Sequence, residues 1–525
     1  MKHINTIAAL ALMVIGLATG LVSCSGDDDN DEPSAPSVTV NLRSCSIAEG
    51  AEYNASELTK VTLSYNTVVA VSQQANITLN GTKCPAASGA TTAMDVDITL
   101  PTLQEGTAYT LTIPEGAVVA KSDPNAKAPA YTVSFTTKAA APHVDNNDAI
   151  ALAKRLGWGW NLGNHFDTSS DEDGKRPQWG YWDNATPTQK LYDNLKQAGA
   201  STVRIGVTWG NYQNTTDWTI DADYMAEVRQ NVEMAEAAGL NVILNMHHDE
   251  YWLDIKSAAG NNIVNDGIKA RLQKTWTQIA EAFKDKGDFL FFETFNEVQD
   301  GQWGWGANRT DGGKQYRTLN EWNQVCVDAI RATGGQNATR WIGVPGYASG
   351  PTFALIDDFK IPTDPAGHIM VSVHFYDPSN FTLTPENKDG KSEWGHTAAA
   401  GKADAGSNED HVVDTFKKLY EKFVVNNIPV YIGEYGCVQH TTERSNLFRN
   451  YYLEYVCRAA HTYNMALCLW DNNSQGGGNE HHGYFNHNDG SYLNNMGPLV
   501  ATMVKAATSD DTAYTLESVY NNAPK

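Results

Sequence analysis

Two glutamates lie at the ends of apolar runs, where a carboxyl group can act at the edge of a fold. Glu297 ends the run 289–297, and Glu434 lies in the run 429–435. One carboxyl that protonates a leaving oxygen and a second that attacks or stabilises an anomeric carbon can together cleave a glycosidic bond. Either glutamate alone could equally form an ion pair at a rim, so the chemistry depends on a fold that brings them together.

A closed parallel sheet is the element that would do so. Eight apolar runs alternate with helix-length stretches, at residues 158–164, 202–209, 241–248, 289–297, 340–347, 369–376, 429–435 and 465–472. Continuous apolar strands, each followed by a helix, predict an α/β (β/α)8 TIM barrel over residues 147–525. A doubly wound open sheet is the alternative, but no glycine-rich phosphate fingerprint follows an early strand.

Three of the intervening helices carry signals of their own. Thr186 is expected to cap one helix, with Pro187 in its first turn, and Asp221 is expected to open another. A third is expected from about Leu319 and to stop at Gly334. These helices would cover the outside of the barrel.

Polar side chains follow nearly every predicted strand, at the end where barrel enzymes hold their active sites. Core packing does not explain so many polar groups after apolar runs. Besides the two glutamates, the candidates for contact with a ligand are Asn164, Arg204, His247, His248, Asn296, His374, Tyr376 and Trp470.

Two other kinds of chemistry are disfavoured. His247 and His248 are adjacent, and neighbouring residues of a strand point to opposite faces, so the two are not expected to bind one metal ion. The same holds for His481 and His482. The nucleophile elbow of serine hydrolases is missing as well. We therefore expect neither a metal nor a cofactor.

The ordered motifs resemble one family. The segments 158–164 (WGWNLGN), 245–249 (NMHHD), 296–297 (NE), 374–376 (HFY), 433–434 (GE) and 469–472 (LWDN) are similar to those of glycoside hydrolase family 5. Within the family they resemble the endo-β-1,4-glucanases, including cellulases, lichenases and xyloglucanases. The resemblance covers residues 147 to about 505. It implies a retaining hydrolase with Glu297 as acid/base and Glu434 as nucleophile. The family usually has proline after the acid/base, and Val298 departs from that pattern, which implies altered subsites.

The expected roles also follow from chemistry. Arg204 and Tyr376 would keep Glu434 ionised, while apolar surroundings and the negative Glu434 would raise the pKa of Glu297. Asn296 would bond a sugar 2-hydroxyl, and Trp470 would stack on a sugar face. The three histidines 247, 248 and 374 would bond sugar hydroxyls or carboxyls. A core role for Trp470 stays open.

Loop tryptophans bear on the substrate. Trp179 and Trp182, Trp303 and Trp305, and Trp394 lie in the loops after the first, fourth and sixth predicted strands. Exposed rings along a groove would bind a long polymer and favour internal cleavage, and we expect at least two of them to face the cleft. Trp276 and Trp322 lie on helical faces and are expected in the core.

Two other functions remain open. A mannanase or xylanase would use the same carboxylates, because only the loops that form the subsites would differ. A non-catalytic surface glycan-binding protein on an inactive barrel is the alternative of another class. The presence of both carboxylates with Arg204, Asn296 and Tyr376 argues against it.

The N-terminus is typical of an export segment. Residues 1–23 have a basic start and a short apolar stretch, and the sequence around Cys24 resembles a lipobox, so Cys24 is expected to be lipidated. Residues 24–36 are acidic and are expected to form a tether. Together they predict an outer-membrane lipoprotein displayed at the cell surface. A free cysteine after an ordinary signal peptide, or a spacer facing the periplasm, is the alternative.

Residues 37–138 predict a different kind of unit. Short runs of alternating apolar residues among Gly, Asn and Pro indicate an all-β sandwich that resembles bacterial Ig-like domains. Cys45 and Cys84 could pair there. All 14 tryptophans lie at 158 or later, which favours a structural spacer over a sugar-binding module. Residues 139–146 are expected to form a linker.

Charge limits the partners. The 525-residue chain has 38 Lys and Arg against 61 Asp and Glu, a net charge of −23. Such a surface repels nucleic acid and anionic substrates, whereas a neutral polymer is indifferent to it. The expected partners are a plant β-glucan polysaccharide and the membrane that holds the lipid of Cys24, and the chain is expected to act as a monomer.

Overall fold

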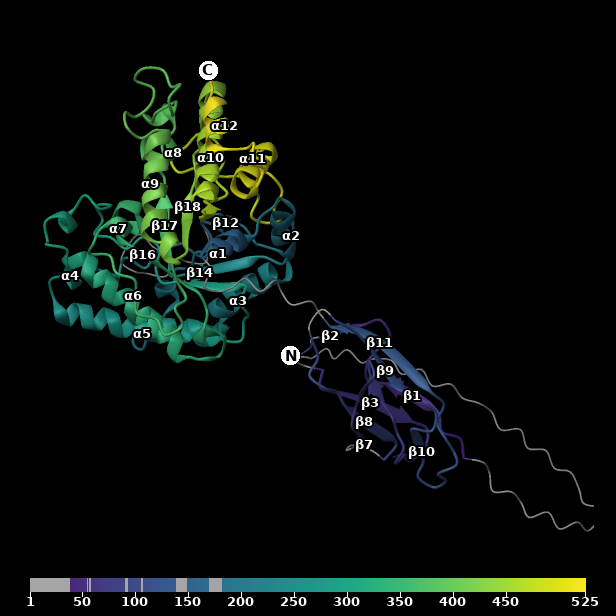
Figure 1. Cartoon of the computed structure of the whole chain (residues 1–525). Coiled ribbons are helices and arrows are strands. Elements are labelled where there is room, and N and C mark those ends of the chain that lie inside the picture. Colours follow the sequence, from purple (N-terminus) through teal and green to yellow (C-terminus); the bar gives the residue numbers. More distant parts are fainter. Residues whose placement is uncertain are drawn as a thin grey trace, which may run out of the picture. The chain divides into compact units, whose positions relative to one another are not determined.

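A computed structural model describes residues 38–53, 55, 58–89, 93–104, 107–137, 149–169 and 182–525 (Figure 1). The chain divides after residue 142 into two compact units. The predicted signal peptide, Cys24, the acidic tether and the linker lie outside the described residues, as does Trp179.

The first unit is made of short strands. Its sheets have the strand orders β1-β3-β8-β7, β2-β11-β9-β5-β6 and β10-β4. The strand bounds are β1 Leu42–Cys45, β2 Glu52–Tyr53, β3 Lys60–Tyr65, β4 Val69–Val71, β5 Thr78–Leu79, β6 Thr82–Lys83, β7 Ala86–Ser88, β8 Asp95–Thr99, β9 Ala108–Ile113, β10 Val118–Ala120 and β11 Tyr131–Thr137. The predicted small all-β unit is confirmed.

Alternating side chains build its core. In β3, Val61, Leu63 and Tyr65 are buried while the residues between them are more exposed, because successive side chains of a strand point to opposite faces. Cys45 and Cys84 are both free thiols, so the pairing that the sequence allowed is not made. Cys45 ends β1 in one sheet, and Cys84 follows β6 in another.

The second unit is a closed parallel barrel of eight strands in chain order, as predicted. The strands are β12 Trp158–Leu162, β13 Thr202–Ile205, β14 Asn241–Asn245, β15 Leu290–Glu293, β16 Ile342–Pro345, β17 Ile369–Phe375, β18 Val430–Tyr435 and β19 Ala466–Leu469. Apart from Asn241, every residue in them is buried, because side chains fill the inside and helices cover the outside.

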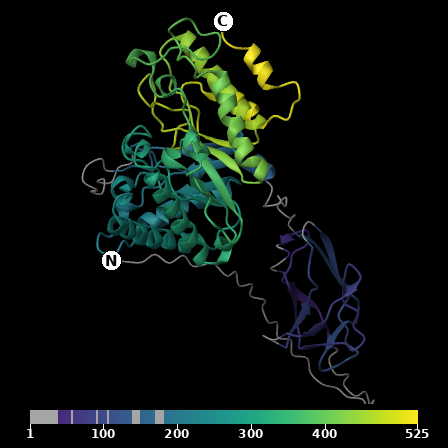
Figure 2. The same cartoon turned by 60° about the vertical axis from the view of Figure 1, so that its left-hand side comes forward.

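Helices surround the barrel, and Figures 1 and 2 show α5 and α6 side by side on one flank. Their bounds are α1 Ala149–Leu156, α2 Gln189–Gln197, α3 Ala222–Ala237, α4 Ile255–Ala258, α5 Asn262–Phe283, α6 Lys314–Ala332, α7 Pro351–Leu355, α8 Ser379–Thr382, α9 Glu409–Lys422, α10 Glu443–Thr462, α11 Gly497–Thr508 and α12 Leu516–Asn521. Short 3-10 turns are η1 Gly210–Tyr212, η2 Ala307–Arg309, η3 Gly335–Ala338, η4 Tyr347–Ser349, η5 Glu386–Lys388 and η6 Val424–Asn426.

Of the three predicted helix starts, one is confirmed. Asp221 caps α3 and accepts hydrogen bonds from the backbone N–H groups of Asp223 and Tyr224. Thr186 does not cap α2, because the chain enters the helix two residues later, at Thr188. Helix α6 begins at Lys314 and not near Leu319, since its first turns bury the polar side chains of Gln315 and Thr318, which an apolar pattern does not mark. Among the described helices, none combines the length and apolarity needed to cross a membrane.

Candidate active site

A bulge in β18 places Glu434 at the mouth of the barrel. The pairing of β17 with β18 shifts register between Val373 and His374, so that Glu434 pairs with His374. Bulges re-aim side chains near functional sites. Gly433 makes the close approach possible, because a Cβ there would lie 3.2 Å from Nε2 of His374 and 3.0 Å from the Ser372 hydroxyl.

Arg204, which follows Val203 in β13, is the centre of the site. Its side chain is fully buried, and its five N–H donors face five acceptors. The distances are 2.7 Å from Nε to Oε2 of Glu293, 2.8 Å from Nη1 to Oε1 of Glu434, 3.0 Å from Nη1 to Oδ1 of Asn161, 2.7 Å from Nη2 to Oδ1 of Asn296 and 3.5 Å from Nη2 to Nε2 of His374. Burial alone would lower the pKa of Arg204, but Glu293 and Glu434 raise it, so the guanidinium stays charged.

Glu293 is a site residue that the sequence analysis missed. It ends β15, is fully buried, and accepts hydrogen bonds from Arg204, from Asn245 Nδ2 at 2.9 Å and from the Ser372 hydroxyl at 2.5 Å. Burial opposes its ionisation, but Arg204 and His374 outweigh that effect and lower its pKa. The available signal was an acid inside an apolar strand, which is costly unless it is paired.

The two candidate catalytic carboxylates meet at His374. Its Nδ1 lies 2.6 Å from Oε1 of Glu297 and 3.7 Å from Oε2 of Glu434. One oxygen of each carboxylate and a nitrogen of His374 lie within 4.8 Å of one another. Retaining glycosidases hold their carboxyl groups about 5–5.5 Å apart, and inverting ones hold them farther apart. The separation fits double displacement.

The two carboxyl groups have different surroundings. The pKa of Glu297 is raised to about 7, mainly by burial and also by the negative Glu250, against the opposing charges of His248 and Arg204. The acids that contribute to this shift are Glu250 and Glu480, where the sequence analysis expected Glu434. Val298, where family members usually have proline, is buried and accepts a hydrogen bond at its carbonyl from Ala348 N–H.

Glu434 is held from several sides. Burial raises its pKa, while the charges of His374 and Arg204 act in the opposite direction. Arg204 acts on this pKa in the expected direction, but desolvation is the larger effect, so the pKa of Glu434 lies above its ordinary value. Tyr376 donates its hydroxyl to Oε2 of Glu434 at 3.0 Å. Because Arg204 occupies the Asn296 oxygen, the amide N–H groups of Asn296 remain as the donors for a ligand.

The three histidines differ in charge. Burial lowers the pKa of His374 to about 4, and it places the pKa of His247 well below its ordinary value. His248 is half-buried. Burial opposes its charge, but Glu250, 3.6 Å from Nδ1, raises the pKa of His248 to about 9. His247 Nε2 lies 3.9 Å from Oε1 of Glu434. Two neutral rings and one cation therefore line the mouth.

His247 and His248 do not lie on opposite faces of a strand, as the sequence led us to expect. β14 ends at Asn245, so both histidines lie beyond the strand, and their ring centroids are 4.5 Å apart. Together with Asp167 they could place three ligand atoms within 4.8 Å of one another, as could Glu297, His374 and Glu434. The second group is the carboxylate pair itself, where a metal would block acid chemistry.

Trp470 and Asn164 lie at the mouth beside these groups. The Trp470 ring is half-buried and nearly parallel to His247, at 5.9 Å and 12°. It is therefore not a core tryptophan. Asn164 follows β12 with a left-handed φ of 58°. Their backbones are tied to Tyr435 and Asp183, through Trp470 N–H to the Tyr435 carbonyl and Asp183 N–H to the Asn164 carbonyl.

The loop tryptophans divide into two groups. Trp182, Trp303 and Trp305 are 43%, 58% and 77% exposed. Trp394 is buried, donates to the Ser407 carbonyl and packs on three tyrosines of α10, so the expectation that it belongs with the loop platforms is wrong. The predicted core positions of Trp276 and Trp322 are confirmed.

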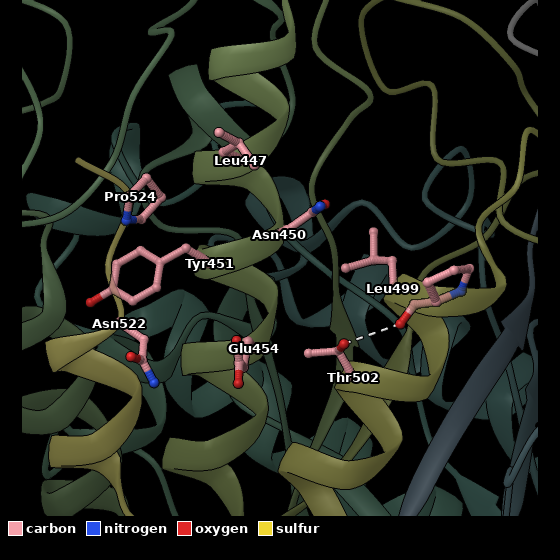
Figure 3. Close-up of a pocket in the computed structure, with 9 residues that line it drawn as sticks. Leu447, Asn450, Tyr451, Glu454, Leu499, Thr502, Asn522 and Pro524 are labelled. Atoms are coloured by element: carbon pink, nitrogen blue, oxygen red, sulfur yellow. Dashed lines mark hydrogen bonds between the residues drawn. The ribbon is translucent and has the colours of Figure 1, made fainter.

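A pocket of about 340 Å³ lies elsewhere, between α10, α11 and the segment after α12 (Figure 3). Its lining includes Leu447, Tyr451, Glu454, Leu499 and Asn522. Its lining residues belong to helices and to the C-terminal segment, and none of them lies at the strand ends that hold the two glutamates. The pocket is therefore not part of the carboxylate site.

Comparison with known proteins agrees with this geometry. The model of the family "Cellulase (glycosyl hydrolase family 5)" matches residues 163–476, which hold both glutamates. Endoglucanase A of Paenibacillus barcinonensis is 32% identical over 377 residues, covering 68% of this chain and 90% of that protein.

Solved structures give the same result. A GH5-4 broad specificity endoglucanase from Bacteroides salanitronis is 47% identical, with a TM-score of 0.65 over 69% of this chain and 96% of that one. A Bacteroides ovatus GH5 xyloglucanase, solved in complex with a XXXG heptasaccharide, is 26% identical, with a TM-score of 0.62 over 90% of this chain and 100% of that one. The similarity therefore extends beyond the barrel.

Proposed function

The chain belongs to glycosyl hydrolase family 5, and we propose from that premise that Glu434 is its nucleophile and Glu297 its acid/base. The protein is an endo-acting hydrolase of β-1,4-glycans that works with net retention. The observation that carries the assignment is the placement of one oxygen from each carboxylate within 4.8 Å, in surroundings of different charge.

In the first step, a Glu434 oxygen attacks the anomeric carbon while the bond from that carbon to the glycosidic oxygen breaks. Glu297 gives its proton to the departing oxygen, and a glycosyl ester of Glu434 remains. In the second step, Glu297 takes a proton from water, whose oxygen attacks the same carbon and releases Glu434. The double inversion retains the anomeric configuration.

The surroundings suit these roles. A pKa of about 7 leaves Glu297 able to give a proton and to take one back. Arg204 and Tyr376 hold the Glu434 carboxylate by charge and hydrogen bond, so its attacking oxygen is oriented. Arg204 fixes the Asn296 amide through its oxygen, which leaves the amide N–H groups to donate to a sugar 2-hydroxyl.

Two substitutions test the assignment. Glu434→Ala should abolish turnover and leave glycan binding largely intact. Glu297→Gln should spare the first step on aryl β-cellobiosides, whose leaving groups need no proton, while hydrolysis of the polymer is lost. Equal losses on both kinds of substrate, or an active Glu434→Ala, would contradict the roles.

A panel of polysaccharides would identify the preferred substrate backbone. Relatives are named for cellulose, lichenan and xyloglucan activity, and we infer that a cellulose-like, mixed-linkage or xyloglucan chain from plants is the substrate here. The panel should hold these polymers with mannan and xylan. Release of reducing sugar only from mannan or xylan would reassign the substrate. Binding without any release would favour a surface glycan-binding protein.

We also propose that the chain is a lipoprotein of the outer membrane, anchored through Cys24, displayed at the surface and monomeric. The support is the lipobox-like sequence and the acidic run after it, together with a site built from one chain. Cys24→Ala should release the protein from the membrane fraction, and protease added to intact cells should remove the wild-type protein. A membrane-bound Cys24→Ala protein would contradict the anchor.

A further inference from the structure

A buried histidine outside the reacting groups bridges two acidic side chains. His487 lies in the segment after β19 and is fully buried. Its Nδ1 is 2.8 Å from Oδ2 of Asp183, and its Nε2 is 3.2 Å from Oδ1 of Asp471. The Trp160 ring meets the imidazole edge to face at 5.0 Å and 82°.

This geometry requires the imidazolium form. A neutral imidazole has one N–H, so one of its two carboxylate neighbours would face a lone pair. Burial by itself would lower the pKa of His487, but the hydrogen bonds that its ring donates to Asp183 and Asp471, together with their negative charges, outweigh burial and raise the pKa to about 9. His165 contacts the other oxygen of Asp183 at 3.0 Å. The charge of His487 thus balances buried carboxylates of two loops.

Asp471 anchors the backbone that carries Trp470. Its Oδ2 accepts from Trp160 Nε1 at 2.9 Å and from the N–H groups of Tyr484 and Phe485 at 3.2 and 2.8 Å. Its carbonyl accepts from Gly163 N–H at 2.9 Å. A Cβ at Gly163 would lie 2.8 Å from the Trp470 ring, so the ring rests on that glycine.

Asp183 anchors the loop after β12. Its backbone N–H donates to the Asn164 carbonyl at 2.9 Å, and its Oδ1 accepts from Ala185 N–H at 3.0 Å. The Asp183 side chain is fully buried. The His487 imidazolium therefore links Asp471, which follows Trp470, to Asp183, which binds the Asn164 backbone. The loops that hold these two residues follow β19 and β12, the last and first strands, whose pairing closes the barrel.

We propose that His487 is a positioning residue of the sugar subsite formed by Trp470 and Asn164, and that its positive charge clamps the first and last loops of the barrel in the sugar-binding arrangement. It touches neither the sugar nor the carboxylates that react. The inference rests on the proposed function, because it needs a sugar against Trp470. Loss of the charge leaves Asp183 and Asp471 facing one another across the gap, and the loops separate.

The test compares His487→Gln with the wild-type full chain on an aryl β-cellobioside. Glutamine keeps a hydrogen-bonding side chain without the charge. At about pH 6, where His487 is protonated, we expect KM to rise about tenfold and kcat to change less than about threefold, because a displaced subsite weakens binding more than proton transfer. His368→Gln is the matched control, since His368 is also buried but precedes β17 at the opposite end of the barrel.

A pH series gives a readout that a structural role would not move. The wild-type KM should rise as the pH passes about 9, and the rise should be smaller in His487→Gln, whose KM is already high at lower pH. His248, whose pKa is also raised to about 9, is present in both proteins, so the difference between them reports His487. The wild-type half of the series needs no variant, so a wild-type KM that stays flat through about pH 9 would contradict the role even if His487→Gln folds poorly. In that event His487→Gln with Asp183→Asn, which removes both charges of the pair, should recover folding.

The outcomes separate the two proposals. A wild-type protein that releases no phenol from the aryl glycoside counts against the proposed function. An active wild type with a KM that stays flat through about pH 9, or a His487→Gln variant whose kinetics match His368→Gln, overturns the role of His487.

Discussion

Nη1 of Arg204 lies 2.8 Å from Oε1 of Glu434, in an ion pair whose arginine is fully buried and whose glutamate is 7% exposed. The same guanidinium holds Glu293 at 2.7 Å, so one cation faces two buried carboxylates. Replacing the arginine leaves these two carboxylates without a compensating positive charge in a buried site.

Substitution of Arg204 should therefore harm both stability and catalysis. For Arg204→Gln we expect unfolding free energy to fall by about 3–5 kcal/mol, since a buried pair loses one partner. Arg204→Lys should restore charge but not the five-donor geometry, and kcat should remain at least about a hundredfold low. Urea denaturation and kinetics on an aryl cellobioside measure these effects. Wild-type kcat in Arg204→Lys would contradict this account.

The pH dependence of kcat/KM should be a bell. Glu297 must carry a proton to act, so the rate should fall as the pH rises through about 7. Glu434 must be ionised to attack, and because burial raises its pKa, the acid limb should lie above the ordinary glutamate range. The two apparent values belong to the interacting pair.

Glu297→Gln provides the check on that assignment. With an aryl substrate the variant should lose the alkaline limb of its first step and keep the acid limb. An alkaline limb near pH 7 that persists in pre-steady-state release would assign it to a group other than Glu297.

His487 should make stability depend on pH. Its pKa is raised to about 9 in the folded protein, above the value of about 6.5 in an unfolded chain. Its contribution is therefore fully present below about pH 6.5 and is lost as the pH rises through about 9. The stability difference between wild type and His487→Gln should shrink by about 3 kcal/mol over that range. Urea titrations at several pH values measure this difference in unfolding free energy. A difference that does not change with pH would show that His487 is not charged in the folded protein.

Trp305 should bind the polymer at a distance from the cleaved bond. Its ring is 77% exposed and is held on one side by Arg309, whose guanidinium carbon lies 3.9 Å from the ring centroid. Trp305→Ala should raise KM for the polymer about two- to tenfold and leave the aryl cellobioside unaffected. Ile263→Ala, at a side chain 85% exposed on α5, is the control. Equal effects on both substrates would show that Trp305 does not bind the polymer at a distance from the cleaved bond.

Chelation should leave activity unchanged, because the proposed steps use carboxyl groups and water alone. Added zinc should inhibit instead, since His374 with Glu297 and Glu434 can present three ligand atoms within 4.8 Å. Assays with and without a strong chelator measure this. Activity that a chelator removes and zinc or calcium restores would establish a metal requirement.

The fold was predictable because its signal repeats. Nearly all of the eight apolar runs carry polar residues at or near their ends, and a parallel barrel puts those ends at one mouth, so Glu297, Glu434 and Arg204 could be grouped from their positions in the chain. Glu293 was not predicted, because the sequence does not show which cation pairs with an acidic residue inside an apolar run. Trp394 was misplaced, because exposure of a loop side chain depends on what packs over it.

The sequence by itself determined the barrel, the family and the pair of carboxylates, through periodic patterns and short motifs that act within one strand or turn. Tertiary structure alone decided which side chains surround that pair. His487 meets Asp183 across 304 residues and Asp471 across 16, in loops that have no repeat. Their contact follows from closure of the barrel between its first and last strands. A charge that is buried there is strongly destabilising unless an opposite charge pairs with it.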